Sequence, residues 1–196
     1  EAYTMTVALI GRVSNYIPPT GVKQLNAHER IANEGMKMLN YYNCIGCHKV
    51  DGMRGDITKL YEDEGNEGPP WLVGEGHRIQ SEWLHYFLGN VHTIRPWVKI
   101  RMPSYNLSNE HKNIIVSGFQ AKSKQKTFID KDKKVVWEPG EKKAAKALFK
   151  SYACTSCHTD GFTKEEAQGP NLYHVKRRLR ESWIKKWLKN PASILP

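Results

Sequence analysis

Two copies of one short pattern, Cys-x-x-Cys-His, constrain this chain more than any other feature. The copies are Cys44-Ile45-Gly46-Cys47-His48 and Cys154-Thr155-Ser156-Cys157-His158, and together they hold all four cysteines of the 196 residues. They are 110 positions apart (154 minus 44). The identical spacing predicts two equivalent sites rather than one site built from four thiols.

Paired cysteines have three common uses, and the histidines discriminate between them. A disulfide across a two-residue gap is a poor structural crosslink, and it leaves His48 and His158 without a role. Two Cys-x-x-Cys pairs can form a tetrahedral zinc site, but here each pair has its own helical context. The third use is covalent haem attachment, in which both thiols bond to the haem and the adjacent imidazole ligates the iron.

An internal repeat surrounds both motifs, which is the pattern of a duplicated domain. Downstream the offset is 100: Leu72, Arg78, Trp83, Leu88, Asn90, Ile94 and Pro96 recur as Leu172, Arg178, Trp183, Leu188, Asn190, Ile194 and Pro196. Upstream the offset is 110, which pairs Gly35, Met38, Leu39 and Tyr42 with Ala145, Leu148, Phe149 and Tyr152. The difference of ten residues falls in an acidic loop, residues 51–67, which we interpret as a surface insertion.

Apolar periodicity predicts an all-α fold with no strand. Helical stripes cover residues 28–42, 81–89, 109–120, 141–152 and 182–189. Ser81 and Ser108 are suitable N-caps for the second and third of these helices. The Lys- and Asp-rich stretch 122–139 is typical of a linker.

With these motifs in view, both halves resemble class I cytochrome c domains. In that family a Gly-Pro-x-Leu segment follows the haem motif, and Met-Pro precedes a final helix. The corresponding segments here are Pro69-Pro70-Trp71-Leu72, Arg101-Met102-Pro103 and Gly169-Pro170-Asn171-Leu172. The resemblance implies two consecutive helical domains, the second lacking its C-terminal helix, and two covalently bound haem c groups as cofactors.

The resemblance also implies roles for individual residues. His48 and His158 would be proximal iron ligands, and Met102 the sixth ligand of the first haem. Pro70 and Pro170 match the proline whose carbonyl orients the proximal imidazole. Arg78 and Arg178 would be either haem-carboxylate partners or surface arginines. Trp83 and Trp183 would pack in the core or at the haem edge.

The second half departs from the family pattern because no methionine follows His158. The alternatives are a ligand in a longer natural chain, a replacement ligand such as His174, or an open iron site. We also expect an exposed apolar stripe on 141–152, since the helix that would cover it is missing. The organisation predicted is a helical segment over 1–25, which resembles the end of a preceding domain, a first domain over 26–121, a linker over 122–139 and a second domain over 140–196.

Net charge and hydropathy limit the kinds of partner that the sequence predicts. The net charge is +10, and a basic cluster near the C-terminus comprises Lys176, Arg177, Arg178, Arg180, Lys185, Lys186 and Lys189. It is either a solvated helix face or a docking surface for an acidic redox partner or a membrane-bound complex. No nucleic-acid motif accompanies the charge, and no apolar run of 18 residues predicts a transmembrane segment.

The function predicted is single-electron transfer between redox partners, as a module of a respiratory complex. The resemblance places such a protein in the periplasm or another extracytoplasmic compartment, since haem is attached there. A haem enzyme with an open second iron, peroxidase-like or acting on another small molecule, is the alternative.

Overall fold

The chain folds as an all-α protein, as its periodicity predicts. The computed structural model describes residues 1–13, 20, 22–52, 55–57, 59–60, 68–125, 136–159 and 169–194. Among these residues there is no sheet, and Ile79 and Leu179 pair in an isolated bridge. No helix in this described part is long and apolar enough to cross a membrane.

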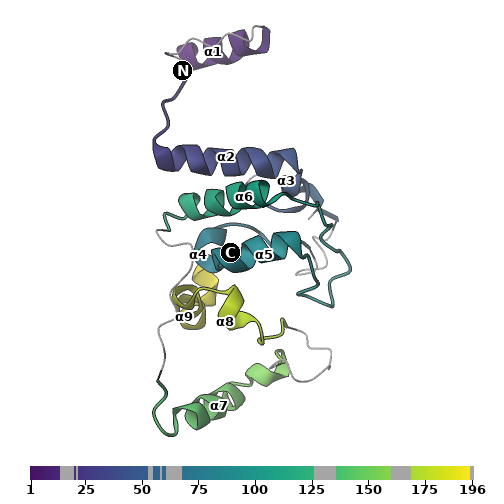
Figure 1. The fold of residues 1–196 in the computed structure, drawn as a ribbon, viewed down its shortest axis with the longest axis vertical. Helices are drawn as coiled ribbons and strands as arrows, with labels where there is room; N and C mark the ends of the chain where they lie inside the picture. The colour runs from purple at the N-terminus through teal and green to yellow at the C-terminus, as the bar shows by residue number, and fades with distance from the viewer. Residues whose placement is uncertain are drawn as a thin grey trace.

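Nine α-helices and two of the short 3-10 helices build the described structure (Figure 1). They are α1 (Ala2–Val13), α2 (Ala27–Tyr41), α3 (Cys44–Cys47), α4 (Glu75–Arg78), α5 (Ser81–Gly89), α6 (Asn109–Lys122), α7 (Glu141–Ser151), η3 (Cys154–Ser156), α8 (Val175–Arg178), α9 (Glu181–Lys189) and η4 (Pro191–Ser193). All five predicted helices are confirmed, with bounds within two residues of those expected. Most of the acidic loop and of the linker, 53–54, 58, 61–67 and 126–135, lies outside the described residues.

Local capping explains where the two longest helices of the first half (residues 26–121) begin. Asn26 and Glu29 form a capping box at the start of α2, each side chain accepting from the other residue's backbone N–H. The Ser108 hydroxyl accepts from the His111 N–H at 3.1 Å, as predicted. The prediction for Ser81 is wrong, because Gln80 is the N-cap of α5 and Ser81 lies buried inside the helix.

Helices α2 and α6 pack closely because two glycines meet at their crossing. A Cβ added to Gly35 would lie 2.6 Å from the Gly118 Cα, which is closer than any real contact. The approach lets Leu39 from α2 join Ile115, Val116 and Phe119 from α6 in one buried cluster. This cluster, with Ile45, Val50 and Leu88, is the core of the first half.

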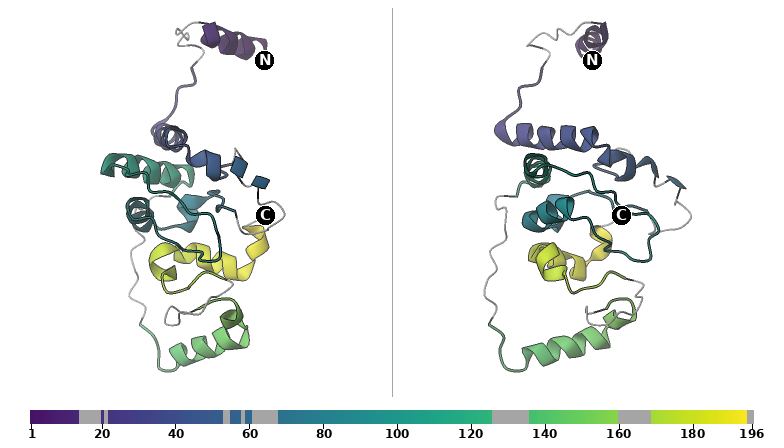
Figure 2. Two further views of the ribbon diagram at one scale, coloured as in Figure 1. Left: turned by 90° about the vertical axis from the view of Figure 1, so that its right-hand side faces the viewer. Right: turned by 45° about the vertical axis from the view of Figure 1, so that its right-hand side comes forward.

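The second half (residues 140–196) docks on the first through residues that correspond in the repeat. The Gln80 N–H donates to the Arg178 carbonyl at 2.8 Å, and the Arg180 N–H donates to the Arg78 carbonyl at 2.9 Å. Helix α4 of the first half contacts α9 of the second half (Figure 2). In the same way, α8, the repeat equivalent of α4, contacts α5, the repeat equivalent of α9. Such reciprocal contacts are those of an isologous interface, in which each copy presents the same surface to the other.

One buried arginine secures this interface between the halves. Arg180 is 1 % exposed, and it donates from Nε to the Ile79 carbonyl at 3.1 Å and from Nη2 to the Ser81 hydroxyl at 3.2 Å. The sequence placed Arg180 in a solvated or docking cluster, and that placement is wrong. Its donors instead satisfy carbonyl and hydroxyl groups that the docking removes from water.

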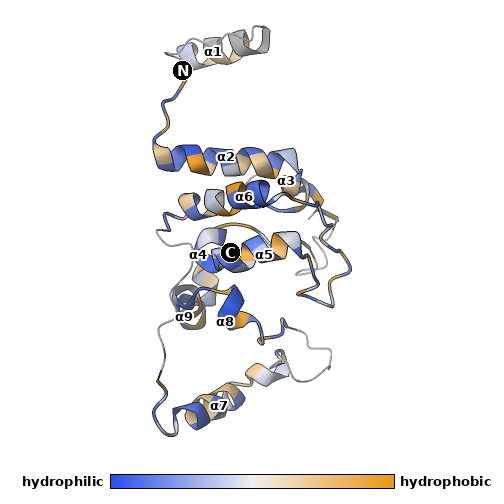
Figure 3. Cartoon of the chain, in the orientation of Figure 1, coloured by the Kyte–Doolittle hydropathy of each residue, from blue (hydrophilic) through white to orange (hydrophobic). Residues whose placement is uncertain are grey.

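Helix α7 has no buried residue, in contrast to its repeat equivalent α2. Leu148 is 55 % exposed and Tyr152, just beyond the helix, is 77 % exposed. Figure 3 shows hydrophobic and hydrophilic residues mixed along this helix. The expected exposed stripe on 141–152 is therefore present in the described structure.

The glycine contact gives a test of the α2–α6 crossing. We expect Gly35→Val to lower the free energy of unfolding by about 1–3 kcal/mol, because the added methyl groups must push the helix backbones apart. Asn33→Val is the control, since Asn33 is exposed on the same helix. Urea unfolding of the purified protein measures both, and equal stabilities of the two variants would contradict the close packing.

Candidate cofactor-attachment sites

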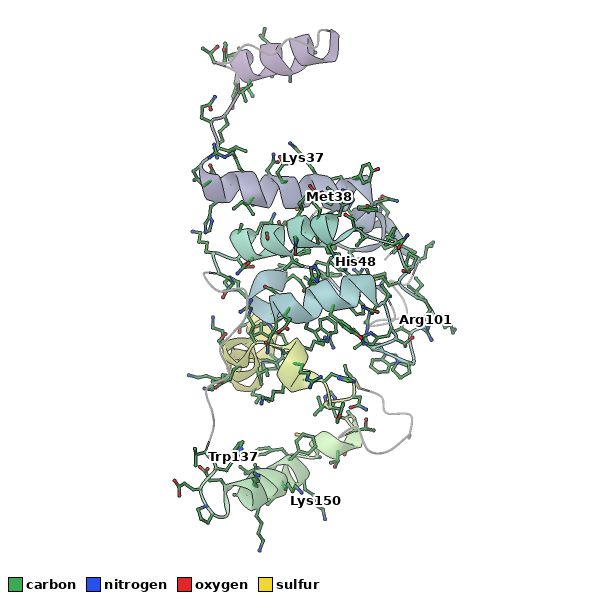
Figure 4. The ribbon with its side chains drawn as sticks, in the orientation of Figure 1. Lys37, Met38, His48, Arg101, Trp137 and Lys150 are labelled. Atoms are coloured by element: carbon green, nitrogen blue, oxygen red, sulfur yellow. The ribbon has the colours of Figure 1, made fainter. Side chains whose placement is uncertain are left out.

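The first motif occupies a single helical turn that is set at an angle to α2 by a left-handed residue. Asn43, directly after α2 and Tyr42, has φ 52°, and α3 then spans Cys44–Cys47. His48 leaves the helix with an extended backbone. The two thiols therefore stand one helical turn apart, and the imidazole follows at the end of that turn. Figure 4 labels His48, which lies between the ribbons of α5 and α6 in that view.

A proline carbonyl fixes the imidazole of His48. The His48 Nδ1 lies 2.8 Å from the Pro70 carbonyl oxygen, so Nδ1 carries the proton and donates it. Burial lowers the pKa of His48, and the charges of Arg95 and Arg78 lower it further, against the opposing effects of Pro70 and Glu75. A neutral ring with its proton on Nδ1 has the Nε2 lone pair available for a metal ion.

The second motif repeats this geometry with different residues. Ala153 has φ 53°, the 3-10 helix η3 follows from Cys154, and the His158 Nδ1 lies 2.8 Å from the Pro170 carbonyl oxygen. Gly169 leaves room for this contact, because a Cβ there would lie 2.9 Å from His158 Nδ1. The same hydrogen bond from a histidine to a proline carbonyl therefore forms in both motifs, whose histidines are 110 positions apart in the sequence.

The four thiols are free in the structure. Cys44 is half-buried, and this burial raises the pKa of its thiol to about 11, whereas Cys157 is exposed. The zinc alternative needs the two pairs to converge, and the described residues contain no group of three His, Cys, Asp or Glu side chains that could hold a metal ion. The structure therefore arranges the cysteines as two separate pairs.

Met102 packs, half-buried, against the core cluster that also contacts Cys44. The nearby Tyr105 is close enough to the first motif for Cys44 and Cys47 to raise the pKa of its phenol, in addition to the larger effect of burial. The segment that carries Met102 thus approaches the first motif from the loop before α6. No counterpart of this segment follows α9 in the described residues.

The two tryptophans named by the repeat have equivalent surroundings. Trp83 stacks on Phe87 with ring centroids 4.9 Å apart, and Trp183 stacks on Trp187 at 5.4 Å. Each pair lies one turn apart on its helix, α5 or α9, which is the spacing at which side chains meet. Both tryptophans are half-buried, and packing at a haem edge stays a prediction.

Arg78 and Arg178 are not ordinary surface residues. Arg78 forms an ion pair with Glu75 and donates to the Trp71 carbonyl at 3.2 Å. Arg178 reaches the other half of the chain, where its guanidinium carbon lies 5.4 Å from the Trp83 ring centroid. The Nε atoms of both side chains are buried without a hydrogen-bond partner.

Two further residues complete the description of the sites. His174 is exposed at the start of α8, with its ring against Tyr173 at 4.8 Å. Arg95, which sequence reasoning missed, donates to the Gly68 carbonyl at 2.8 Å and acts on the pKa of His48. The residue that corresponds to it in the repeat is Leu195, which carries no charge, so the repeat gave no signal for Arg95.

The left-handed residue before the second motif can be tested by a pair of glycine substitutions. Ala153→Gly should raise the free energy of unfolding by about 1 kcal/mol, because glycine adopts a positive φ without the steric cost that Cβ imposes. Ala147→Gly, at an exposed position inside α7, should lower it by roughly 1 kcal/mol. Thermal unfolding of both variants measures this difference, and the same sign of change in the two would contradict the left-handed turn.

The chain was also compared with known proteins. Neither the protein-family models, nor the curated proteins, nor the solved structures gave a match.

Proposed function

We propose that this chain is a dihaem c-type cytochrome that transfers single electrons between redox partners. The observation that supports this most directly is the repeated histidine geometry. In each Cys-x-x-Cys-His motif the imidazole Nδ1 is 2.8 Å from a proline carbonyl, which directs Nε2 to a ligand. A pair of unrelated cysteine motifs would have no reason to share this contact.

The residues present fit covalent haem in both halves. Each motif offers two free thiols on one turn and an oriented imidazole. Two partnerless Nε atoms of Arg78 and Arg178 are suited to the carboxylates of a haem. The haem would supply the electron chemistry, while the protein sets its potential and the encounter surface.

The first site is suited to electron transfer rather than to catalysis on a substrate. Met102 packs against the cluster that contacts Cys44, and it would be the sixth ligand of the first haem. Two protein ligands leave no open position on the iron and raise its reduction potential. The neutral state of His48, favoured by burial, would suit its imidazole to bind the iron.

The exposed basic side chains indicate the kind of partner, and the proposed haem indicates the compartment. Five members of the basic cluster are exposed: Lys176, Arg177, Lys185, Lys186 and Lys189. They form a surface for an acidic redox partner or for a respiratory complex, and this attraction would weaken with added salt. Covalent haem attachment implies an extracytoplasmic location.

Removing one cysteine pair at a time tests the haem assignment. We expect Cys44→Ser with Cys47→Ser to lose one covalent haem, and Cys154→Ser with Cys157→Ser to lose the other, because each motif would attach its own group. The intact mass of the denatured protein, produced in a host that attaches c-type haem, measures this.

The unsubstituted chain is the control and should carry two haems. A mass without haem in the control, or the loss of both haems from one double variant, would contradict two independent attachment sites.

The sixth ligand can be tested at Met102. Met102→His should remove the near-infrared band of Met-ligated ferric haem and lower the potential of that haem by roughly 0.2 V, a part of the ~0.8 V range that axial ligands span. Met38→His, at a half-buried position on α2, is the control and should keep the band. A band that survives Met102→His would assign the sulfur ligand elsewhere, and a high-spin signal from the second haem would favour the enzyme alternative.

A further inference from the structure

Three arginines, two from the first half and one from the second, are near enough for their charges to act on one another, and Glu75 is ion-paired with one of them. Arg78 and Arg95 come from the first half and Arg178 from the second. The charge of Arg78 acts on the pKa of both other arginines, and that of Arg95 acts on Arg178. Glu75, itself 6 % exposed, is the acidic group that acts on Arg178 and is ion-paired with Arg78.

Among the described residues, Glu75 is the acid that pairs with this cluster, and two of the cluster's donors are buried without an acceptor. Burial lowers the pKa of Arg178 to about 10, and the like charge of Arg78 contributes further. Burial also lowers the pKa of Arg95. The Nε atoms of Arg78 and Arg178 are both buried without a hydrogen-bond partner. Buried donors and like charges of this kind require a compensating acceptor with negative charge.

The repeat shows that the helix of Arg178 has no counterpart of Glu75, the carboxylate that pairs with Arg78. Glu75 lies three residues before Arg78 and pairs with it on α4. The residue three positions before Arg178 is Val175, the repeat equivalent of Glu75. The second half has therefore replaced the local acid by a neutral residue while keeping the arginine, and Arg178 lies over Trp83 of the other half.

The backbone holds Arg178 in that position. Its carbonyl accepts from the Gln80 N–H at 2.8 Å, and the next residue, Leu179, pairs with Ile79 in the isolated bridge. Gln80 also donates from Nε2 to the Leu179 carbonyl at 3.1 Å. The backbone at Arg178 and Leu179 is thus hydrogen-bonded to the first half, which places the Arg178 side chain against that half.

The position of the cluster identifies the group it faces. Arg78 donates to the Trp71 carbonyl at 3.2 Å and Arg95 to the Gly68 carbonyl at 2.8 Å. Both therefore hold the segment whose Pro70 carbonyl accepts from His48, the proposed iron ligand of the first half. Trp83, beneath Arg178, belongs to α5, whose Leu88 lies in the first core. All three arginines are therefore associated with the first site.

We propose that Arg178, although it belongs to the second half, binds a carboxylate of the haem attached to Cys44 and Cys47, together with Arg78 and Arg95. The inference rests on the proposed function. It makes the second half a structural part of the first haem site, so that docking of the halves sets the potential of the first haem. A carboxylate of the second haem could bind the same guanidinium groups. The two haems are distinguished by their reduction potentials, because only the haem whose carboxylate binds Arg178 should change potential when Arg178 is substituted.

The test measures the potential of each haem in Arg178→Gln. Loss of a positive charge next to a haem favours the ferric form, so the potential of the Met-ligated haem should fall. We expect a change of about tenfold in its reduction equilibrium, or ~59 mV for one electron. A redox titration followed on the near-infrared absorbance that Met102→His removes reports the first haem. Arg177→Gln, exposed and adjacent, is the matched control and should leave this potential nearly unchanged.

A second variant separates charge from packing. Arg178→Lys keeps the charge but loses the planar fork, so it should fold like the unsubstituted chain and show a smaller fall in the same potential. Equal potentials of the first haem in Arg178→Gln, Arg178→Lys and Arg177→Gln would overturn the proposal. A shift confined to the second haem would also overturn it, by assigning the carboxylate to that haem.

The haem content of each variant is measured first by intact mass. Two covalent haems with an unmoved first potential would refute only the role of Arg178. A chain without covalent haem would refute the proposed function and this inference with it.

Discussion

A hydrogen bond from a histidine Nδ1 to a proline carbonyl organises each half of this protein. At 2.8 Å in both halves, it joins the cysteine turn to the segment that leads into α4 or α8. The bond fixes the ring tautomer, and it brings the downstream segment beside the motif although 22 residues separate His48 from Pro70 and 12 separate His158 from Pro170. The shorter and the longer connection therefore end in the same contact. The helices that follow then carry the arginines and tryptophans to equivalent positions.

The two halves differ in how much of their stability they supply themselves. The buried hydrophobic residues found in the described part of the chain all lie between Leu39 and Ala121. The second half contributes Arg180 to the buried set, and it docks through reciprocal backbone bonds at Ile79 and Leu179. In the proposed dihaem protein, a covalently held haem would add a large apolar surface to the second half. Stability, docking and redox potential would then be coupled through the same short segment.

The sequence predicted the helices and the repeat well, because both depend on short-range patterns. The stripes on α2 and α6 and the Ser108 cap follow from local spacing, and the structure has them. Other features depend on contacts that no local pattern encodes. Ser81 was assigned as a cap because of its position, but it serves as an acceptor for Arg180 from the other half. The run of basic residues predicts one exposed surface that includes Arg178 and Arg180, whereas in the docked chain Arg180 is buried and Arg178 is half-buried. Ala153 gave no signal for a left-handed backbone, because glycine or asparagine is the usual choice there.

The central claim is that each motif carries one redox-active haem, and a count of electrons tests it most directly. The purified protein, produced with covalent haem attachment, would be oxidised fully and then titrated coulometrically under anaerobic conditions while its visible spectrum is recorded. The account predicts uptake of two electrons per chain, in two one-electron steps, with the spectrum of low-spin c-type haem developing in proportion. Uptake of no electrons, or of one electron with one motif left as free thiols, would contradict it.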